Sequence, residues 1–282
     1  MKFSICITTH DRWKLCLEVL EAVYQQSYNE FEVILIDDCA HLVPPKELAL
    51  YIKKDHFRFV KNAENLGLAQ CRNTAISLAT GDYFIFCDDD DRWGSKYLQS
   101  LKDILFNHHL DFIYTYESKS QNIIKIDTHK KFFASGYSPP VAGQCYRLEV
   151  LKDSLYGNVT QCVDHDLWVT LLPIDLIGMV RNSSEIETNF AGIDNKKMTR
   201  QHDYRIKQCA LNLDRWKPLI VSELGKEFFD MFSAQYFGYL YMKKDYDDYL
   251  QKNSFPKWSS IKRFVSLSLR RRCFNDPRIF FL

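Results

Sequence analysis

The sequence predicts an α/β fold, with a mostly parallel central sheet flanked by helices on both faces. Over the first hundred residues, short apolar runs alternate with segments whose apolar residues recur at helical spacing, which is the rhythm of strand–helix–strand units. Three of the apolar runs end in polar clusters, and ligands bind at the carboxyl ends of the strands in such sheets. The composition, 46% hydrophobic and 26% charged, fits a folded core and excludes disordered, collagen-like and coiled-coil chains.

The elements of the first hundred residues follow in order. Four apolar runs are predicted strands, at 3–8, 31–36, 57–61 and 83–87. Three segments between them are predicted helices, at 13–26, 45–54 and 67–79. The first of these helices carries an amphipathic stripe of Cys16, Val19, Leu20 and Val23. Because a helix joins each strand to the next, neighbouring strands can run parallel.

The pattern loosens after residue 100. We expect a helix over 101–106, a strand over 112–116, and a helix over 162–172 with Asp164 and Asp166 in its first turn. Residues 117–140 are polar and predict a loop. The whole pattern predicts one domain over residues 1–200 and a helical C-terminal extension over 201–282.

Charge and cysteine usage limit the class of protein. The 37 Lys and Arg balance 36 Asp and Glu, which argues against a dedicated nucleic-acid binder. The nine cysteines are odd in number and scattered, with no CxxC pair, so we expect free, buried thiols in a reducing cytosol. The N-terminal apolar run is too short for a signal peptide, and no run approaches the roughly 20 residues that span a bilayer. We therefore expect a cytoplasmic protein, soluble or peripheral at the inner face of a membrane.

Polar clusters follow three predicted strands: Thr8-Thr9-His10-Asp11, Asp37-Asp38 and Asp88-Asp89-Asp90-Asp91. A run of four carboxylates directly after an apolar strand is costly without a counter-charge. Two interpretations stay open on the residues alone. The run is either a solvated acidic turn or helix cap, or a site for a divalent cation that bridges to a phosphate-bearing substrate, as Mg²⁺ and Mn²⁺ commonly do.

The C-terminal segment differs from the rest. Residues 251–282 hold eight Lys or Arg and one acid, a charge of +7, which leaves −6 for the first 250 residues. Trp258, Ile261, Phe264 and other apolar residues alternate with the basic ones. Such a segment can lie on an anionic membrane surface. The alternative is a helix packed on its own domain with a solvated basic face.

Five motifs in order resemble those of family 2 glycosyltransferases with the GT-A fold. They are the opening strand Ser4–Arg12, the second strand Phe31–Asp38, the segment Asn65–Asn73, the strand Gly81–Trp93 with its Asp-x-Asp motif, and the helix start Val163–Trp168. Each is weak alone, and their order over residues 3–172 makes the resemblance specific. It implies that residues 1–100 bind a nucleotide sugar and residues 101–200 the acceptor.

The resemblance also implies roles for single residues. Thr8 and Asp38 would hold the uracil of a UDP-sugar donor, Asp88 the ribose, and Asp90 a Mn²⁺ or Mg²⁺ ion at the diphosphate. Asp164 would be the general base for the acceptor hydroxyl, and Arg72 would lie close to the nucleotide. Asp166 cannot face the same way as Asp164 on a helix, so we expect it to act as a cap or support.

The implied activity is inverting, metal-dependent transfer of a sugar to a glycan or lipid-linked acceptor in surface polysaccharide or glycoconjugate synthesis. The chain departs from the family pattern at Val163, where Glu is usual, and in having no His within 188–192. A nucleotidyltransferase would need a glycine-rich loop that 8–13 lacks, and no G-x-G-x-x-G supports an NAD enzyme. A catalytically inactive glycosyltransferase-like scaffold is the alternative from another class.

Overall fold

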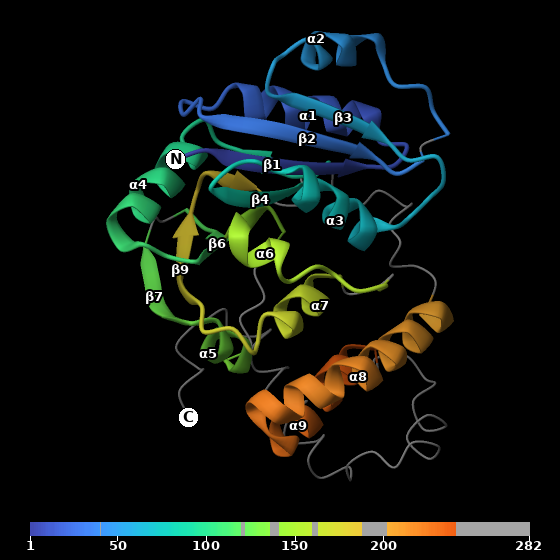
Figure 1. Ribbon diagram of the computed structural model, residues 1–282, viewed down its shortest axis with the longest axis vertical. Coiled ribbons are helices and arrows are strands. Elements are labelled where there is room, and N and C mark those ends of the chain that lie inside the picture. The colour runs from blue at the N-terminus through green and yellow to red at the C-terminus, as the bar shows by residue number, and fades with distance from the viewer. Residues whose placement is uncertain (40, 120–121, 136–140, 160–162, 188–201, 241–282) are drawn as a thin grey trace. The chain divides into compact units, whose positions relative to one another are not determined.

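The computed structural model describes residues 1–39, 41–119, 122–135, 141–159, 163–187 and 202–240 (Figure 1). The chain divides into two compact units. One comprises Met1–Phe133 and Tyr137–Lys196, and the other Ala134–Gly136 and Lys197–Leu282.

An eight-stranded sheet forms the centre of the first unit, in the order β3-β2-β1-β4-β8-β6-β9-β7. Its strands are β1 (Phe3–Thr9), β2 (Phe31–Asp37), β3 (Phe57–Lys61), β4 (Tyr83–Asp88), β6 (Phe112–Glu117), β7 (Ile123–Thr128), β8 (Gln144–Arg147) and β9 (Ile177–Ser183). The first four strands along the chain pair in parallel, as predicted. Beyond β4 the sheet is mixed, because β8 runs antiparallel to both of its neighbours and β7 is antiparallel to β9.

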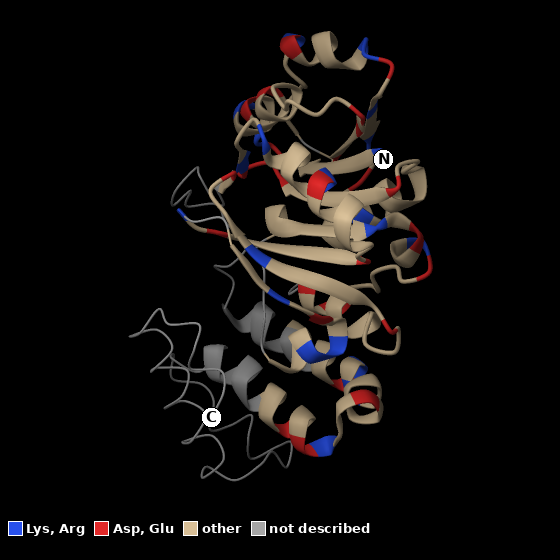
Figure 2. Ribbon diagram, turned by 90° about the vertical axis from the view of Figure 1, so that its left-hand side faces the viewer, with Lys and Arg blue, Asp and Glu red and all other residues tan. Residues whose placement is uncertain are grey.

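Helices cover both faces of the sheet, as the sequence predicts. The buried side chains of Phe3, Ile5 and Ile7 in β1 pack in one cluster with α1 (Trp13–Tyr24) and α4 (Tyr97–His108). On the opposite face α3 (Leu68–Leu78) lies against β1 and β2. In Figure 2 the strands are largely uncharged, and most charged positions fall on helices and loops. Burial of apolar residues on both faces explains why the central strands read as continuous apolar runs.

Shorter elements complete the first unit. They are a 3₁₀ turn (Lys46–Leu48), α2 (Ala49–Ile52), α5 (His129–Ala134), a 3₁₀ turn (Val141–Gly143), α6 (Leu148–Lys152), α7 (Val163–Thr170), and a two-stranded ribbon of β5 (Arg92–Trp93) and β10 (Ile186–Glu187).

Two sequence expectations need correction. Residues 117–140 are not simply a loop, since they contain β7 and α5. The strand escaped prediction because it lies at the sheet edge with Ile123, Ile124 and Ile126 all exposed, so burial imposes no alternating pattern on it. The helix expected at 45–54 is only a 3₁₀ turn followed by the single turn of α2.

The second unit contains α8 (His202–Leu224) and α9 (Lys226–Leu240), which pack against each other. Gly225 joins them with φ of +87°, a conformation that suits glycine. Trp216 and Phe232 are buried between the helices, with ring centroids 6.4 Å apart. No helix in the described part of the chain is long and apolar enough to cross a membrane. The basic segment 251–282 lies outside the described residues.

Candidate active site

The polar clusters meet at one edge of the sheet. Strands β2, β1 and β4 are adjacent and parallel, so their carboxyl ends lie together. Thr8 pairs in register with Asp88, and Thr9 with Asp37. The strand topology therefore brings three clusters that are far apart in the sequence to one place, where parallel α/β sheets bind ligands.

Arg72 of α3 links two of the predicted site residues. Its Nη1 donates to Asp164 Oδ1 at 2.8 Å and its Nη2 to Asp88 Oδ1 at 3.3 Å. The Arg72 guanidinium is buried, 5.0 Å from the ring centroid of Phe86 and 5.9 Å from that of Tyr156. Asp88 and Asp164 each keep 31% of their side-chain surface exposed. One buried cation thus holds two accessible carboxylates side by side.

Asp88 and Asp164 lie in different surroundings. Burial raises the pKa of Asp88, and Arg72 opposes the rise while the carboxylates of Asp164 and Asp90 add to it. Asp164 lies in the first turn of α7, where the helix dipole favours a negative charge. The next carboxylate on this helix faces elsewhere, since Asp166 is buried and its Oδ2 accepts from the Gly157 N–H at 2.7 Å.

The acidic run after β4 has its counter-charge in Arg12. Its guanidinium pairs with Asp89 and, at 3.1 Å, with Asp90 Oδ2, while the Thr9 hydroxyl donates to Asp89 Oδ2 at 2.7 Å. Burial raises the pKa of Asp89, and Arg12 and Thr9 counter that rise. Sequence reasoning placed Thr9 in a polar cluster and Arg12 in a motif, and gave neither a role in the site. The available signal was that a run of four carboxylates requires a cation nearby.

Asp38 is tied into the start of α3. Its Oδ1 accepts from the Leu66 N–H at 2.8 Å and from Asn62 Nδ2 at 3.0 Å, and its Oδ2 accepts from the Gly67 N–H at 2.9 Å. The side chain is buried. Thr8 is partly exposed at the end of β1. Contact of Thr8 and Asp38 with a nucleotide base stays a prediction.

Comparison with known proteins identifies the family. The family described as "Glycosyl transferase family 2" matches this chain over residues 4–167, which is more than half of its length. The chain belongs to glycosyl transferase family 2. This confirms the family expected from the five motifs, whose Asp-x-Asp and Val163–Trp168 segments both fall inside or at the end of the match.

Curated sequence relatives of this family 2 glycosyltransferase are also named as glycosyltransferases. A relative from Erwinia amylovora, the amylovoran biosynthesis glycosyltransferase AmsB, is 32% identical over 104 residues, which cover 35% of this chain and 34% of that protein. The chain thus spans about a third of the length of such curated relatives.

Two solved structures match most of the chain. TarS 1-349 of S. aureus, in complex with UDP-GlcNAc, has a TM-score of 0.62 at 17% identity, covering 94% of this chain and 79% of that one. The mannosyltransferase PcManGT of Pyrobaculum calidifontis, in complex with GDP-Man and Mn²⁺, has a TM-score of 0.58 at 12% identity, covering 96% and 80%. These likenesses confirm the GT-A fold.

The residues at the end of β4 fit the divalent cation that the family implies. Asp88 and Asp90 offer carboxylate oxygens, the ligands that Mg²⁺ and Mn²⁺ favour. Asp90 already has a cationic partner in Arg12, so a bound cation would share that carboxylate with the guanidinium. The segment 188–192, where the family often places a further His, lies outside the described residues.

Proposed function

We propose that this chain is an inverting, metal-dependent glycosyltransferase that moves a sugar from a nucleotide diphosphate, most simply a UDP-sugar, to a glycan or lipid-linked acceptor. The observation that carries the proposal is the pairing of Asp88 and Asp164 on Arg72. A donor-side carboxylate and a carboxylate suited to accept a proton lie next to each other and are both accessible, as transfer between two bound substrates requires.

The proposed step is a single displacement. The acceptor hydroxyl attacks the anomeric carbon of the donor, its proton passes to an oxygen of Asp164, and the bond to the diphosphate breaks with its electron pair leaving on the nucleoside diphosphate. The hydrogen bond from Arg72 orients the Asp164 carboxylate for this transfer. A divalent cation at Asp90 would neutralise charge on the leaving diphosphate, and Asp88 would contact the ribose.

The names and bound ligands of relatives support the proposed donor, cofactor and pathway. TarS is described with UDP-GlcNAc and with UDP, which supports a UDP-sugar. PcManGT is described with Mn²⁺, which supports Mn²⁺ or Mg²⁺ as cofactor. AmsB is named for amylovoran biosynthesis, which supports surface polysaccharide or glycoconjugate synthesis. An enzyme of this kind would meet its acceptor in the cytoplasm or at the inner face of the membrane.

Calorimetry with UDP, GDP and dTDP tests the proposal, each nucleotide being titrated with Mn²⁺ and again with EDTA. We expect UDP to bind, and EDTA to weaken that binding. The variant Asp164→Asn should bind UDP as the wild type does and fail to transfer, because the amide cannot accept the proton. Normal transfer by Asp164→Asn would refute the base assignment. A lack of binding by every nucleotide would instead favour the inactive scaffold.

A further inference from the structure

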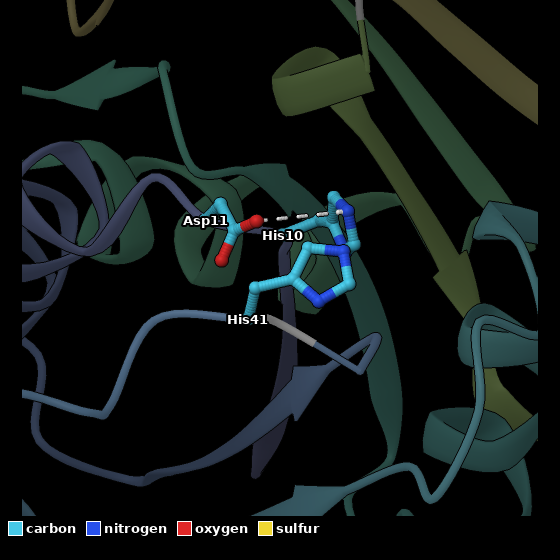
Figure 3. Close-up of side chains that lie close together, drawn as sticks. All are labelled: His10, Asp11 and His41. Atoms are coloured by element: carbon cyan, nitrogen blue, oxygen red, sulfur yellow. Dashed lines mark ion pairs between the residues drawn. The ribbon is translucent and has the colours of Figure 1, made fainter.

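Three side chains outside the proposed active site converge at the loop that follows β1. His10 and Asp11 lie in that loop, and His41 lies in the loop that follows β2 (Figure 3). One ligand atom of each residue lies within 4.8 Å of the others. His10 Nε2 is 4.0 Å from Asp11 Oδ2, and the imidazole centroids of His10 and His41 are 6.0 Å apart.

The hydrogen bonds of His10 leave one ring nitrogen available for a ligand. Nδ1 lies 2.8 Å from the backbone oxygen of Asp38. Since a carbonyl oxygen only accepts, Nδ1 carries the hydrogen, and in the neutral imidazole the lone pair is then on Nε2. A histidine whose other nitrogen donates to a carbonyl is the usual arrangement at metal sites, because that bond fixes the tautomer and the ring orientation.

The two carboxylate oxygens of Asp11 also have different partners. Oδ1 accepts from the Leu42 N–H at 2.8 Å, so Oδ2 is the oxygen that faces His10. Oδ2 is thus the Asp11 oxygen that is placed to bind an ion.

The geometry points to a transition-metal site at His10, Asp11 and His41, which we assign to Zn²⁺. Two imidazoles and one carboxylate are a donor set typical of zinc and unlike the oxygen-only ligands of Mg²⁺. Tetrahedral ligands at about 2.0–2.2 Å from zinc lie about 3.3–3.6 Å apart. The three ligand atoms, which lie within 4.8 Å of one another, must therefore approach by up to about 1.5 Å. His41 is exposed, and a rotation of its side chain can bring it in.

A bound ion would tie together two loops that border the proposed nucleotide site. His10 also bonds the backbone of Asp38, so both loops meet at the residue that anchors the start of α3. Zinc would thus act as a clamp at this edge of the sheet. Its ligands are distinct from Asp88 and Asp90, and the inference stands whether or not the donor is a UDP-sugar.

The test is calorimetric titration of Zn²⁺ into the full chain in excess Mg²⁺, which occupies oxygen-rich sites. We expect one zinc per chain. His41→Ala should weaken binding at least about tenfold. Asp11→Asn should do the same, although its amide oxygen can still accept from Leu42. Two matched controls should bind as the wild type does: His56→Ala, which removes an exposed histidine elsewhere, and Cys39→Ser, which removes the thiol nearest to His41 in the sequence.

A second readout identifies the ligands. With Co²⁺ in place of Zn²⁺, we expect visible d–d bands that disappear in His41→Ala, and no thiolate-to-cobalt charge-transfer band. Zinc should also raise the melting temperature of the wild type and not that of His41→Ala, since a ligand stabilises the state that binds it. Unchanged zinc binding in both His41→Ala and Asp11→Asn, a thiolate band, or no zinc binding by the wild type would each overturn the assignment.

Discussion

Arg72 decides the geometry of the proposed site, because one guanidinium fixes both accessible carboxylates. Its two terminal nitrogens serve different acids, Asp164 at 2.8 Å and Asp88 at 3.3 Å. A lysine at this position would keep the charge but present a single nitrogen, which cannot reproduce the fork. The buried position beneath Phe86 also suits a planar group better than an ammonium.

We therefore predict that Arg72→Lys lowers kcat for sugar transfer by about 100-fold, the cost of a displacement near 1 Å at a catalytic group. The measurement is steady-state kinetics with a UDP-sugar and an acceptor, or slow donor hydrolysis where the acceptor is unknown. Arg58→Lys is the matched control, because Arg58 is exposed and contacts Glu32 and the Leu78 carbonyl, neither of which is a proposed site residue. A kcat equal to that of the control would show that Arg72 does not position Asp164.

His129 makes the stability of the fold depend on pH. It is buried, its Nε2 donates to the Trp168 carbonyl at 2.8 Å, and its Nδ1 accepts from the Tyr114 hydroxyl at 3.1 Å. Burial lowers the pKa of His129 to about 4. Below about pH 6.5, His129 is therefore protonated in the unfolded chain and stays neutral in the folded chain until the pH approaches 4. The contribution of His129 to stability is complete above that pH and is lost as the pH falls toward 4.

Urea unfolding at pH 7 and pH 5 measures this effect. We predict that His129 accounts for a fall of about 2 kcal/mol in the free energy of unfolding between the two values. His129→Gln should be less stable at pH 7 and should lose most of this slope, whereas His56→Gln, at an exposed position, should keep it. An identical slope in both variants would contradict the assignment to His129.

The sequence named the residues that carry the chemistry more readily than those that position them. Asp88, Asp90 and Asp164 follow recognisable local patterns. The contacts of Arg12 and Thr9 with the acidic run join residues 77 and 80 positions apart, and only the parallel pairing of β1 and β4 creates them. The sequence did not predict the His10–Asp11–His41 cluster for the same reason, since His41 comes from another loop.

At the scale of elements, prediction succeeded where burial produces a clear pattern of apolar residues in the sequence. Strands β1, β2 and β4 are buried on both faces and read as apolar runs, and α1 buries a single stripe. Strand β7 is exposed, and β8 is a four-residue strand that includes Gln144 and Arg147. Backbone pairing with β9, β4 and β6 forms these strands, and that pairing leaves little trace in a local sequence window.

The close approach of a 3₁₀ turn to β6 gives an element-scale prediction. A Cβ placed on Gly143 would lie 1.9 Å from the backbone oxygen of Thr115. That backbone is held in the sheet by pairing with β9. We predict that Gly143→Ala lowers the free energy of unfolding by about 3 kcal/mol, at the upper end of the usual cost of overpacking.

Urea titration at pH 7 measures the change, and Gly94→Ala is the matched comparison. A Cβ on Gly94 would meet first the carboxylate of Glu185, the end of a flexible side chain, so the substitution should cost less. If both variants lose the same free energy of unfolding, the backbone before β8 shifts as easily as a flexible side chain does, and the prediction is wrong.

At the scale of the whole molecule, the net charge is near zero although two parts of the sequence carry opposite charges. The formal charge of +1 is the sum of +7 in residues 251–282 and −6 in residues 1–250. Apolar residues such as Trp258 and Phe264 are interspersed among the basic ones. This distribution suits attraction of one end of the chain to anionic lipid while the remainder is repelled. A lipid-linked acceptor would be found on such a surface.

We predict that the full chain co-sediments with phosphatidylserine vesicles at low salt and that replacing Arg270, Arg271 and Arg272 with Gln weakens binding. Each basic residue near the surface contributes about 1 kcal/mol, so the triple variant should bind roughly 100-fold more weakly. Replacing the exposed Lys14, Lys53 and Lys96 with Gln changes the net charge equally and should leave binding intact. Equal loss in the two triple variants would mean that the overall charge, and not the C-terminal segment, determines attachment.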